Sequence, residues 1–291
     1  MHRSRQGPAV SCRCGRGHCV APRFPKPRVP RLASHDPQAP ARPGDLELLR
    51  AAYLDLVRDS LIGRLNEDPA LPASKVEGYR DDFREQGWDW PSKAPSMIGA
   101  RRMQNVRSEC ERVLRQEVPG DFLEAGVWRG GACIMMRAVL KAYGITDRRV
   151  IAADSFAGFP IPGEGTPDAG FEHAGNPAFA VPLHEVKAAF ARYHLLDQQV
   201  VFVEGLFKDT LPEAPVGALA VLRLDGDMYE STRDGLVSLY HKLSPGGTLI
   251  LDDYFLSESQ RRAVDEFRAA HAIIDPMVQI DHFGGYWIKS A

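Results

Sequence analysis

The pattern of apolar positions changes near residue 121. Before that point, apolar residues recur at helical spacing in two stretches, from Asp45 through Leu61 and from Ser96 to Leu114, with a loop-rich region between them over residues 64–95. After it, short apolar runs alternate with stretches of helical period. The expected strands cover residues 122–127, 149–154, 200–204, 219–225, 248–253, 277–281 and 286–289.

Strands that alternate with helices predict an α/β fold in which a mostly parallel sheet is covered on both faces. The fully apolar character of the first strands agrees, because central strands of a parallel sheet meet no water. The last two strands are expected to form a closing antiparallel pair. We therefore predict a doubly wound, mostly parallel, seven-stranded sheet.

The composition of the first residues differs from that of the rest. Residues 1–45 hold nine of the 36 Lys and Arg residues, only two acidic residues, and eight of the 22 prolines. Such a segment buries too little apolar surface to offset the entropy of ordering it. We predict a disordered basic tail over residues 1–44, a helical segment over residues 45–118 that packs on the core, and the α/β domain over residues 119–291.

Charge and cysteine content limit the partners and the compartment. The formal net charge of −2 gives no overall basic field for nucleic acid. No apolar run approaches the roughly 20 residues of a membrane helix, and no signal-peptide pattern is found, so a cytoplasmic location is expected. Cys12, Cys14, His18 and Cys19 lack the paired C-x2-C hooks of a zinc site. The five cysteines favour a reducing compartment over a disulfide framework.

Acidic residues close each of the first five predicted strands. Ligands of such sheets bind at the carboxyl ends of the strands. A single acid there also fits a turn or a helix start, but five acidic strand ends on one edge indicate a binding site. The acids are Glu124, Asp154, Glu204, Asp225, Asp252 and Asp253.

The first of these strand ends leads into a glycine-rich turn, Glu124-Ala-Gly-Val-Trp-Arg-Gly-Gly131. It is similar to the turn of dinucleotide-binding folds but does not match G-x-G-x-x-G. Gly126 would allow a tight turn and close approach of a ligand, and a turn without a ligand is the alternative. Asp154 could accept the hydroxyl hydrogens of a ribose. The turn alone does not distinguish S-adenosylmethionine from NAD.

The acids of the fourth and fifth strands predict a cation site. Neighbouring strand ends lie about 5 Å apart, so Asp225, Asp252 and Asp253 could share one ion that offsets their mutual repulsion. Carboxylate oxygens suit Mg²⁺, with Mn²⁺ or Ca²⁺ as alternatives. Such an ion would hold two neighbouring acceptor oxygens and lower the pKa of the one to be methylated. We expect Asp225 to act as metal ligand and base; His173 and His184 are alternative bases.

The chain resembles the macrocin O-methyltransferase family, whose members methylate sugar hydroxyls of macrolides and related natural products. The resemblance covers roughly residues 46–290. Besides the glycine turn, it is carried by Ala153-Asp-Ser-Phe156, Phe207-Lys-Asp-Thr-Leu-Pro212, Leu222-Arg-Leu-Asp-Gly-Asp-Met-Tyr-Glu-Ser231 and Leu251-Asp-Asp-Tyr254.

The resemblance implies an S-adenosylmethionine-dependent, Mg²⁺-assisted sugar O-methyltransferase with a Rossmann-like class I methyltransferase domain over residues 119–291. It implies that Asp225, Asp252 and Asp253 bind the metal, that residues 156–182 form a lid over the acceptor, and that the chain forms a homo-oligomer, a dimer or tetramer. The implied cofactor-binding residues are Ser96, Met97, Glu124, Ala125, Gly126, Val127, Trp128, Asp154, Ser155, Phe156, Ala157, Gly158 and Asp225.

Two other interpretations remain at this stage. A nicotinamide oxidoreductase would use a similar sheet, but it would require a fuller glycine fingerprint and has no use for the aspartate cluster. A non-catalytic, methyltransferase-like binding domain would not need the acidic cluster to stay intact. The expected partner of the enzyme is a small glycosylated acceptor, with neither nucleic acid nor membrane involved.

Overall fold

A seven-stranded sheet lies at the centre of the computed structural model, which describes residues 44–290. The strand order is β3-β2-β1-β4-β5-β7-β6; β7 runs antiparallel to both of its neighbours, β5 and β6, so the last two strands form the predicted antiparallel pair. The cysteines of the predicted tail lie outside the described residues. The strands are β1 Asp121–Ala125, β2 Val150–Asp154, β3 Val200–Glu204, β4 Leu219–Leu224, β5 Leu243–Leu251, β6 Val278–Gln279 and β7 Gly285–Ile288.

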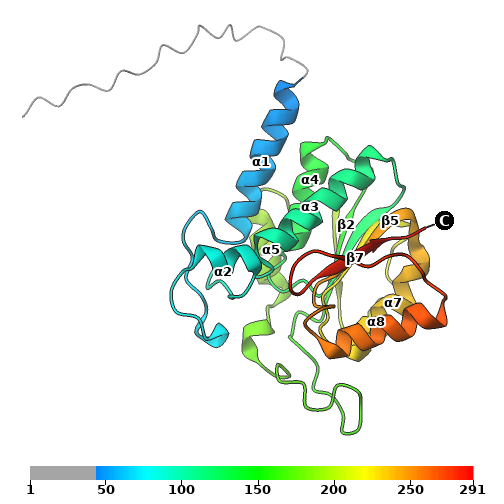
Figure 1. The fold of residues 1–291 in the computed structure, drawn as a ribbon. Helices are drawn as coiled ribbons and strands as arrows, with labels where there is room; N and C mark the ends of the chain where they lie inside the picture. The colour runs from blue at the N-terminus through cyan, green and yellow to red at the C-terminus, as the bar shows by residue number, and fades with distance from the viewer. Residues whose placement is uncertain (1–43, 291) are drawn as a thin grey trace, which may run out of the picture. The chain divides into compact units, whose positions relative to one another are not determined.

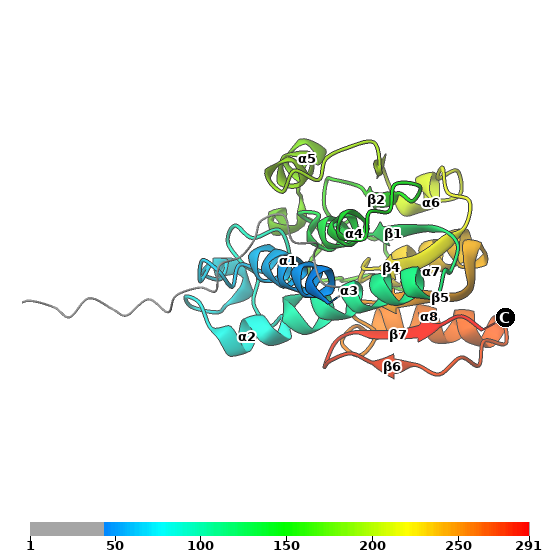
Figure 2. The ribbon, with the colours of Figure 1, turned by 90° about the horizontal axis from the view of Figure 1, so that it is seen from above.

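Helices cover both faces of this sheet (Figures 1 and 2). One face carries α1 Asp45–Leu61, α3 Gly99–Arg115, α4 Gly131–Ala142 and α5 Leu183–Arg192. The other carries α6 Phe207–Thr210, α7 Tyr229–Leu239 and α8 Glu258–Ala270. Away from the two faces lie α2 Asp81–Gln86 and the short 3-10 turns η1 Pro72–Ser74 and η2 Pro177–Phe179, whereas Tyr240 of η3 Tyr240–Lys242 packs in the core on the side of α7 and α8.

Alternation along the strands divides the core in two. Phe122 of β1 packs with the α3 and α4 layer, whereas its neighbour Leu123 packs with the α7 and α8 layer, and both are fully buried. Successive side chains of a strand point to opposite faces, so a strand covered on both sides is mostly apolar; Glu124 of β1 and Arg223 of β4 are the buried charged exceptions. The doubly wound sheet is thus confirmed.

The helices of the N-terminal segment belong to the same core as the sheet. Leu54 of α1 and Met103 of α3 are fully buried and share a cluster with Ile134 of α4 and Phe122 of β1. Arg50 of α1 donates a hydrogen bond to the carbonyl of Ala142 at the end of α4. No helix within residues 44–290 is long and apolar enough to cross a membrane.

Several elements differ from their predicted extent, among them β1, which ends at Ala125, and β6, which covers only Val278–Gln279. The second predicted helix begins at Gly99 rather than at Ser96, because the backbone N–H of Ser96 donates to the carbonyl of Leu61 and holds this segment beside α1. Strand β5 begins at Leu243 and runs through Pro245-Gly246-Gly247, with a register shift against β4. The six-residue α2 lies within the region predicted to be loops, too short to show a helical period.

The glycine turn after β1 brings two strand ends into close contact. Gly126 has φ +90°, and a Cβ added there would lie 1.9 Å from the carbonyl oxygen of Asp225. The turn is fixed on both sides, since the Gly126 N–H donates to Ala153 and the Asp225 N–H donates to Ala125. Only glycine therefore fits between β1 and the first residue after β4.

Packing of the N-terminal helices on the core predicts unequal effects of two leucine truncations in α1. Leu54 is fully buried and Leu48 is 71% exposed. Leu54→Ala should lower the free energy of unfolding by about 3 kcal/mol, and Leu48→Ala by less than about 0.5 kcal/mol. Urea unfolding measures both; equal values would show that α1 is not part of the core.

Because Gly126 is in tight contact with Asp225, an alanine at this position should destabilise the protein more than a positive φ alone would. Gly144 also has a positive φ, +68°, but nothing lies within 4 Å of an added Cβ. Gly144→Ala should cost about 1 kcal/mol of unfolding free energy, and Gly126→Ala about 3 kcal/mol or more because β1 and β4 must separate. Similar losses in urea unfolding would contradict the tight contact.

Candidate functional site

A cavity of about 720 Å³ opens at the carboxyl ends of the central strands. Its wall includes the glycine turn after β1, the end of β2, the residues after β4 and β5, and parts of the loops over residues 87–98 and 155–179. Its position agrees with the general rule for open α/β sheets. All but one of the acids predicted at the strand ends line it; Glu204 is exposed and lies outside the wall.

Arg223 joins three of these acids beneath the cavity. It lies on β4 beside Glu124 of β1, and only 1% of its side chain is exposed. Its guanidinium pairs with Glu124, with Asp252 and, at 2.8 Å, with Asp225. Because a buried charge is costly without a partner, this arginine explains how three carboxylates can share one edge.

Arg102 extends the same network from α3. Its buried guanidinium pairs with Asp252 and, at 3.2 Å, with Asp281 in the loop between β6 and β7. Asp252 thus lies between two arginines, one from the sheet and one from the N-terminal segment. Its carboxylate is 4% exposed and is held by hydrogen bonds at both oxygens.

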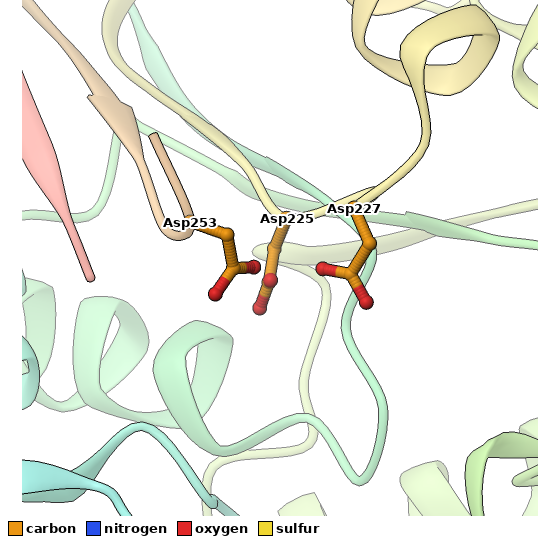
Figure 3. A group of neighbouring side chains, drawn as sticks. All are labelled: Asp225, Asp227 and Asp253. Carbon is orange, nitrogen blue, oxygen red and sulfur yellow. The ribbon is translucent and has the colours of Figure 1, made fainter. Parts of the chain in front are cut away.

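A second group of three carboxylates, which shares Asp225 with this network, converges beside it. Asp225, Asp227 and Asp253 each offer an oxygen, and these oxygens lie within 4.8 Å of one another. Figure 3 shows the three side chains pointing into the same space from two neighbouring segments, the one after β4 and the one after β5. The structure therefore brings predicted ligands Asp225 and Asp253 together with Asp227, whereas predicted ligand Asp252 lies lower, against the arginines.

Burial and mutual repulsion raise the pKa of all three acids. Desolvation is the largest cause in each case, and it raises the pKa of Asp227 to about 7. Asp252 also raises the pKa of Asp225, which Arg223 opposes, and Asp227 raises that of Asp253. Carboxylates this close are stable only if they share protons or a cation. The oxygen-only ligand set matches a hard divalent ion such as Mg²⁺.

The glycine turn and the end of β2 form a second part of the wall. The carboxylate of Asp154 accepts hydrogen bonds from the N–H groups of Val127, at 2.7 Å, and Phe156, at 2.8 Å. It therefore joins the glycine turn after β1 to the start of the long loop after β2. The carboxylate of Glu124 accepts from the N–H and Sγ of Cys133, and burial raises its pKa while Arg223 lowers it.

The N-terminal segment contributes the wall opposite the sheet. Ser96 and Met97, which are predicted to contact the cofactor, line the cavity. The N–H of Gly131 donates to the carbonyl of Pro95, and a Cβ at Gly131 would lie 2.4 Å from that of Ser96. The start of α4 and this loop are therefore in direct contact.

An aromatic cluster from the long loop forms the outer wall. The ring centroids of Phe159 and Phe171 lie 5.0 Å apart, and that of Phe171 lies 5.6 Å from that of His173. The ring of Trp90, from the N-terminal segment, lies 5.0 Å from that of Phe179. His173 is packed among these rings, 5.7 Å from Trp90. His184, the other histidine considered, is absent from the cavity wall.

Most residues predicted to bind the cofactor line the cavity, but three do not. Ala125 is fully buried in the core, Phe156 packs against Phe202 at 6.3 Å, and Ala157 is exposed beside the wall. Sequence reasoning also passed over three residues: Asp227, Arg223 and Arg102. The first two stand in the Leu222–Ser231 motif, where an arginine inside an apolar strand was a signal for a buried ion pair.

Comparisons with known proteins agree with this site. The family model described as macrocin-O-methyltransferase (TylF) matches residues 50–289, a range that includes every residue lining the cavity. The demethyldecarbamoylnovobiocin O-methyltransferase of Streptomyces niveus is 48% identical over 248 residues, 82% of this chain and 93% of that protein. The mycinamicin III 3''-O-methyltransferase of Micromonospora griseorubida is 47% identical over 246 residues, 82% of this chain and 96% of that protein.

The fold is also that of a solved relative. The O-methyltransferase NovP superposes with a TM-score of 0.80 at 48% identity, covering 83% of this chain and all of that one. These relatives are named as O-methyltransferases, so they support neither a nicotinamide oxidoreductase nor a non-catalytic domain. The chain belongs to the macrocin O-methyltransferase family and is an O-methyltransferase.

Proposed function

We propose that this enzyme transfers the methyl group of S-adenosylmethionine to a sugar hydroxyl of a glycosylated natural product, assisted by a divalent cation. The observation that carries the proposal is the group of three carboxylates, Asp225, Asp227 and Asp253, on the wall of a cavity that also contains the glycine turn. The names of the relatives support the acceptor class, since two of them act on demethyldecarbamoylnovobiocin and on mycinamicin III.

The methyl donor is expected to bind between the glycine turn and the segment at Ser96. Gly126 leaves the backbone open to a ligand, and Asp154 lines the cavity at the end of β2. Oδ2 of this carboxylate accepts one N–H, from Val127, and keeps a lone pair for a ribose hydroxyl, whereas Oδ1 accepts from the N–H of Phe156 and the hydroxyl of Ser155. Ser96 and Met97 close this part of the cavity from the N-terminal side.

Asp225 and Asp253 are the residues best placed to hold the cation. They come from adjacent strand ends, and each offers an oxygen to the same space. A bound divalent cation would lower the pKa of an acceptor hydroxyl. Asp252 remains a predicted third ligand; its pairing with Arg102 and Arg223 places it beside this site and fixes its orientation.

Asp227 is proposed as the group that takes the hydroxyl proton. Asp225, expected from sequence to be the base, pairs with Arg223 at 2.8 Å, so one of its oxygens is engaged by the guanidinium and is less free to take a proton. Asp227 forms no ion pair with a basic residue among residues 44–290, and it lines the cavity. A positioned carboxylate of this kind contributes about 10²- to 10⁴-fold to the rate.

The expected homo-oligomer and the cytoplasmic location stay predictions. The oligomeric state follows directly from light scattering of the purified chain, with a dimer or tetramer expected.

The acceptor class is tested with the substrates of the two relatives. With S-adenosylmethionine and Mg²⁺, we expect a methyl group to be added to demethyldecarbamoylnovobiocin or mycinamicin III, and tandem mass spectrometry should locate it on the sugar. The matching aglycones without the sugar are the control. Methylation of an aglycone, with none of a glycoside, would contradict the proposal.

The cation site predicts a specific loss of metal-dependent stability. Mg²⁺ at about 100 times its dissociation constant stabilises a protein by about 2.7 kcal/mol, which for this size raises Tm by about 5 °C or more. Asp225→Asn and Asp253→Asn should abolish this rise and reduce methyl transfer at least a hundredfold, while affinity for S-adenosylhomocysteine is retained.

Asp147→Asn is the matched control, because Asp147 is exposed and lies outside the cavity wall. It should show the same Mg²⁺-dependent rise in Tm as the unaltered enzyme. An equal rise in Asp225→Asn or Asp253→Asn, measured by differential scanning fluorimetry with EDTA as the baseline, would refute the assigned ligands.

A further inference from the structure

The long loop over residues 157–180 holds a single buried residue, and that residue is charged. Asp168 is 3% exposed, whereas the other residues of this segment are partly or fully exposed, Ile161 to 83%. An isolated carboxylate is the most costly kind of side chain to remove from water. Its burial in an otherwise exposed loop indicates a specific attachment.

The attachment is to the first turn of α7. The carboxylate of Asp168 accepts hydrogen bonds from the N–H of Tyr229, at 2.7 Å, and from the N–H of Glu230, at 2.9 Å. The first N–H groups of a helix have no partner within the helix, and the helix dipole favours a negative charge there. The residue at the N-cap position, Met228, supplies no side-chain cap. Asp168 therefore provides, from 61 residues away, the cap that α7 lacks.

The loop that Asp168 holds forms the outer side of the cavity. Phe159, Phe171 and His173, on either side of it in sequence, line the cavity and contact one another through their rings. A second hydrogen bond that attaches the loop lies near its end, where the indole of Trp128 donates to the carbonyl of Ala178 at 2.9 Å. In the middle of the loop, the hydrogen bonds of Asp168 therefore act together with the packing of Trp90 on His173.

The helix that Asp168 caps, α7, begins two residues after Asp227. Only Met228 separates Asp227 from Tyr229, the first residue of α7. The hydrogen bonds of Asp168 therefore join the outer wall of the cavity to the segment that carries Asp225 and Asp227. A change in this attachment would alter the space between the lid and the carboxylates, where the proposed acceptor must lie.

We propose that Asp168 is a positioning residue for the acceptor: it fastens the middle of the lid to the N-terminus of α7 and so holds the aromatic wall against the cavity. The acceptor part of this inference rests on the proposed function. The fastening itself does not, and it can be measured without any acceptor. If Asp168 were only a helix cap, it would stabilise α7 and leave the lid unaffected.

The first test compares Asp168→Asn with Glu164→Gln, which removes an exposed carboxylate from the same loop. Hydrogen exchange followed by mass spectrometry should show peptides of residues 157–176 exchanging about tenfold faster in Asp168→Asn, and unchanged in Glu164→Gln. The affinity for S-adenosylhomocysteine should stay within twofold. With an accepted glycoside, KM should rise about tenfold and kcat should change less than threefold.

The second test breaks the same attachment from the other side. Tyr229→Pro removes one donor N–H at the first helical position, where proline is favoured, and the extended Met228, at φ −82° and ψ 153°, can precede a proline. Tyr229→Ala is its control, because it loses the same side-chain contacts with Glu266 but keeps the N–H. Tyr229→Pro alone should loosen the lid, and the effect of Asp168→Asn should be smaller in that background.

Faster exchange confined to α7, or an unchanged lid in both Asp168→Asn and Tyr229→Pro, would overturn the inference and leave Asp168 as a helix cap. A loosened lid with unaltered KM for the glycoside would overturn its role toward the acceptor. If no glycoside is methylated at all, the proposed acceptor class fails, while the exchange measurement still decides whether the attachment exists.

Discussion

The buried guanidinium of Arg223 is the interaction on which the rest of the site depends. It lies between Glu124, Asp225 and Asp252, which come from three neighbouring strand ends. Without a cation at this point, three carboxylates would be buried side by side at a cost of several kcal/mol each. The sheet can therefore present acids along its carboxyl edge only because one of its central strands carries an arginine.

The arginines neutralise only some of the acids on this edge. Arg223 and Arg102 both pair with Asp252, while Asp227 and Asp253 receive no ion pair within residues 44–290. The lower part of the edge is thus neutralised within the protein, whereas the carboxyl groups of Asp227 and Asp253, whose pKa values burial raises, face the cavity without a basic partner. Arg102 comes from α3, so the N-terminal helices take part in the electrostatics of the site as well as in its packing.

The fold could be predicted from sequence because its elements are repetitive. Apolar strands such as 219–224 alternate with helices of clear period, and this pattern specified the sheet and both of its layers. The errors lie where local pattern competes with tertiary contact. Ser96 fits a helix, but its hydrogen bond to Leu61 draws it into the cavity wall. The four residues of α6 are too few to show any period.

The site was predictable in part. Because Glu124, Asp154 and Asp225 end predicted strands, the sequence predicted that they lie on one edge of the sheet, and in the structure all three line the cavity there. Contacts between distant parts of the chain could not be derived, because no local pattern encodes them: Arg102 meets Asp252 across 150 positions, and Asp168 meets α7 across 61. Their partners are known only once the chain is folded.

The central claim is that acids from two adjacent strand ends bind a divalent cation in the donor cavity. Its most direct test is a crystal structure of the enzyme soaked with Mn²⁺ and S-adenosylhomocysteine, using anomalous scattering. The account predicts one peak at ligand distance, about 2.2 Å, from oxygens of both Asp225 and Asp253, and the same map shows whether Asp227 or Asp252 is the third ligand. A cavity without such a peak, or a peak that contacts neither Asp225 nor Asp253, would contradict it.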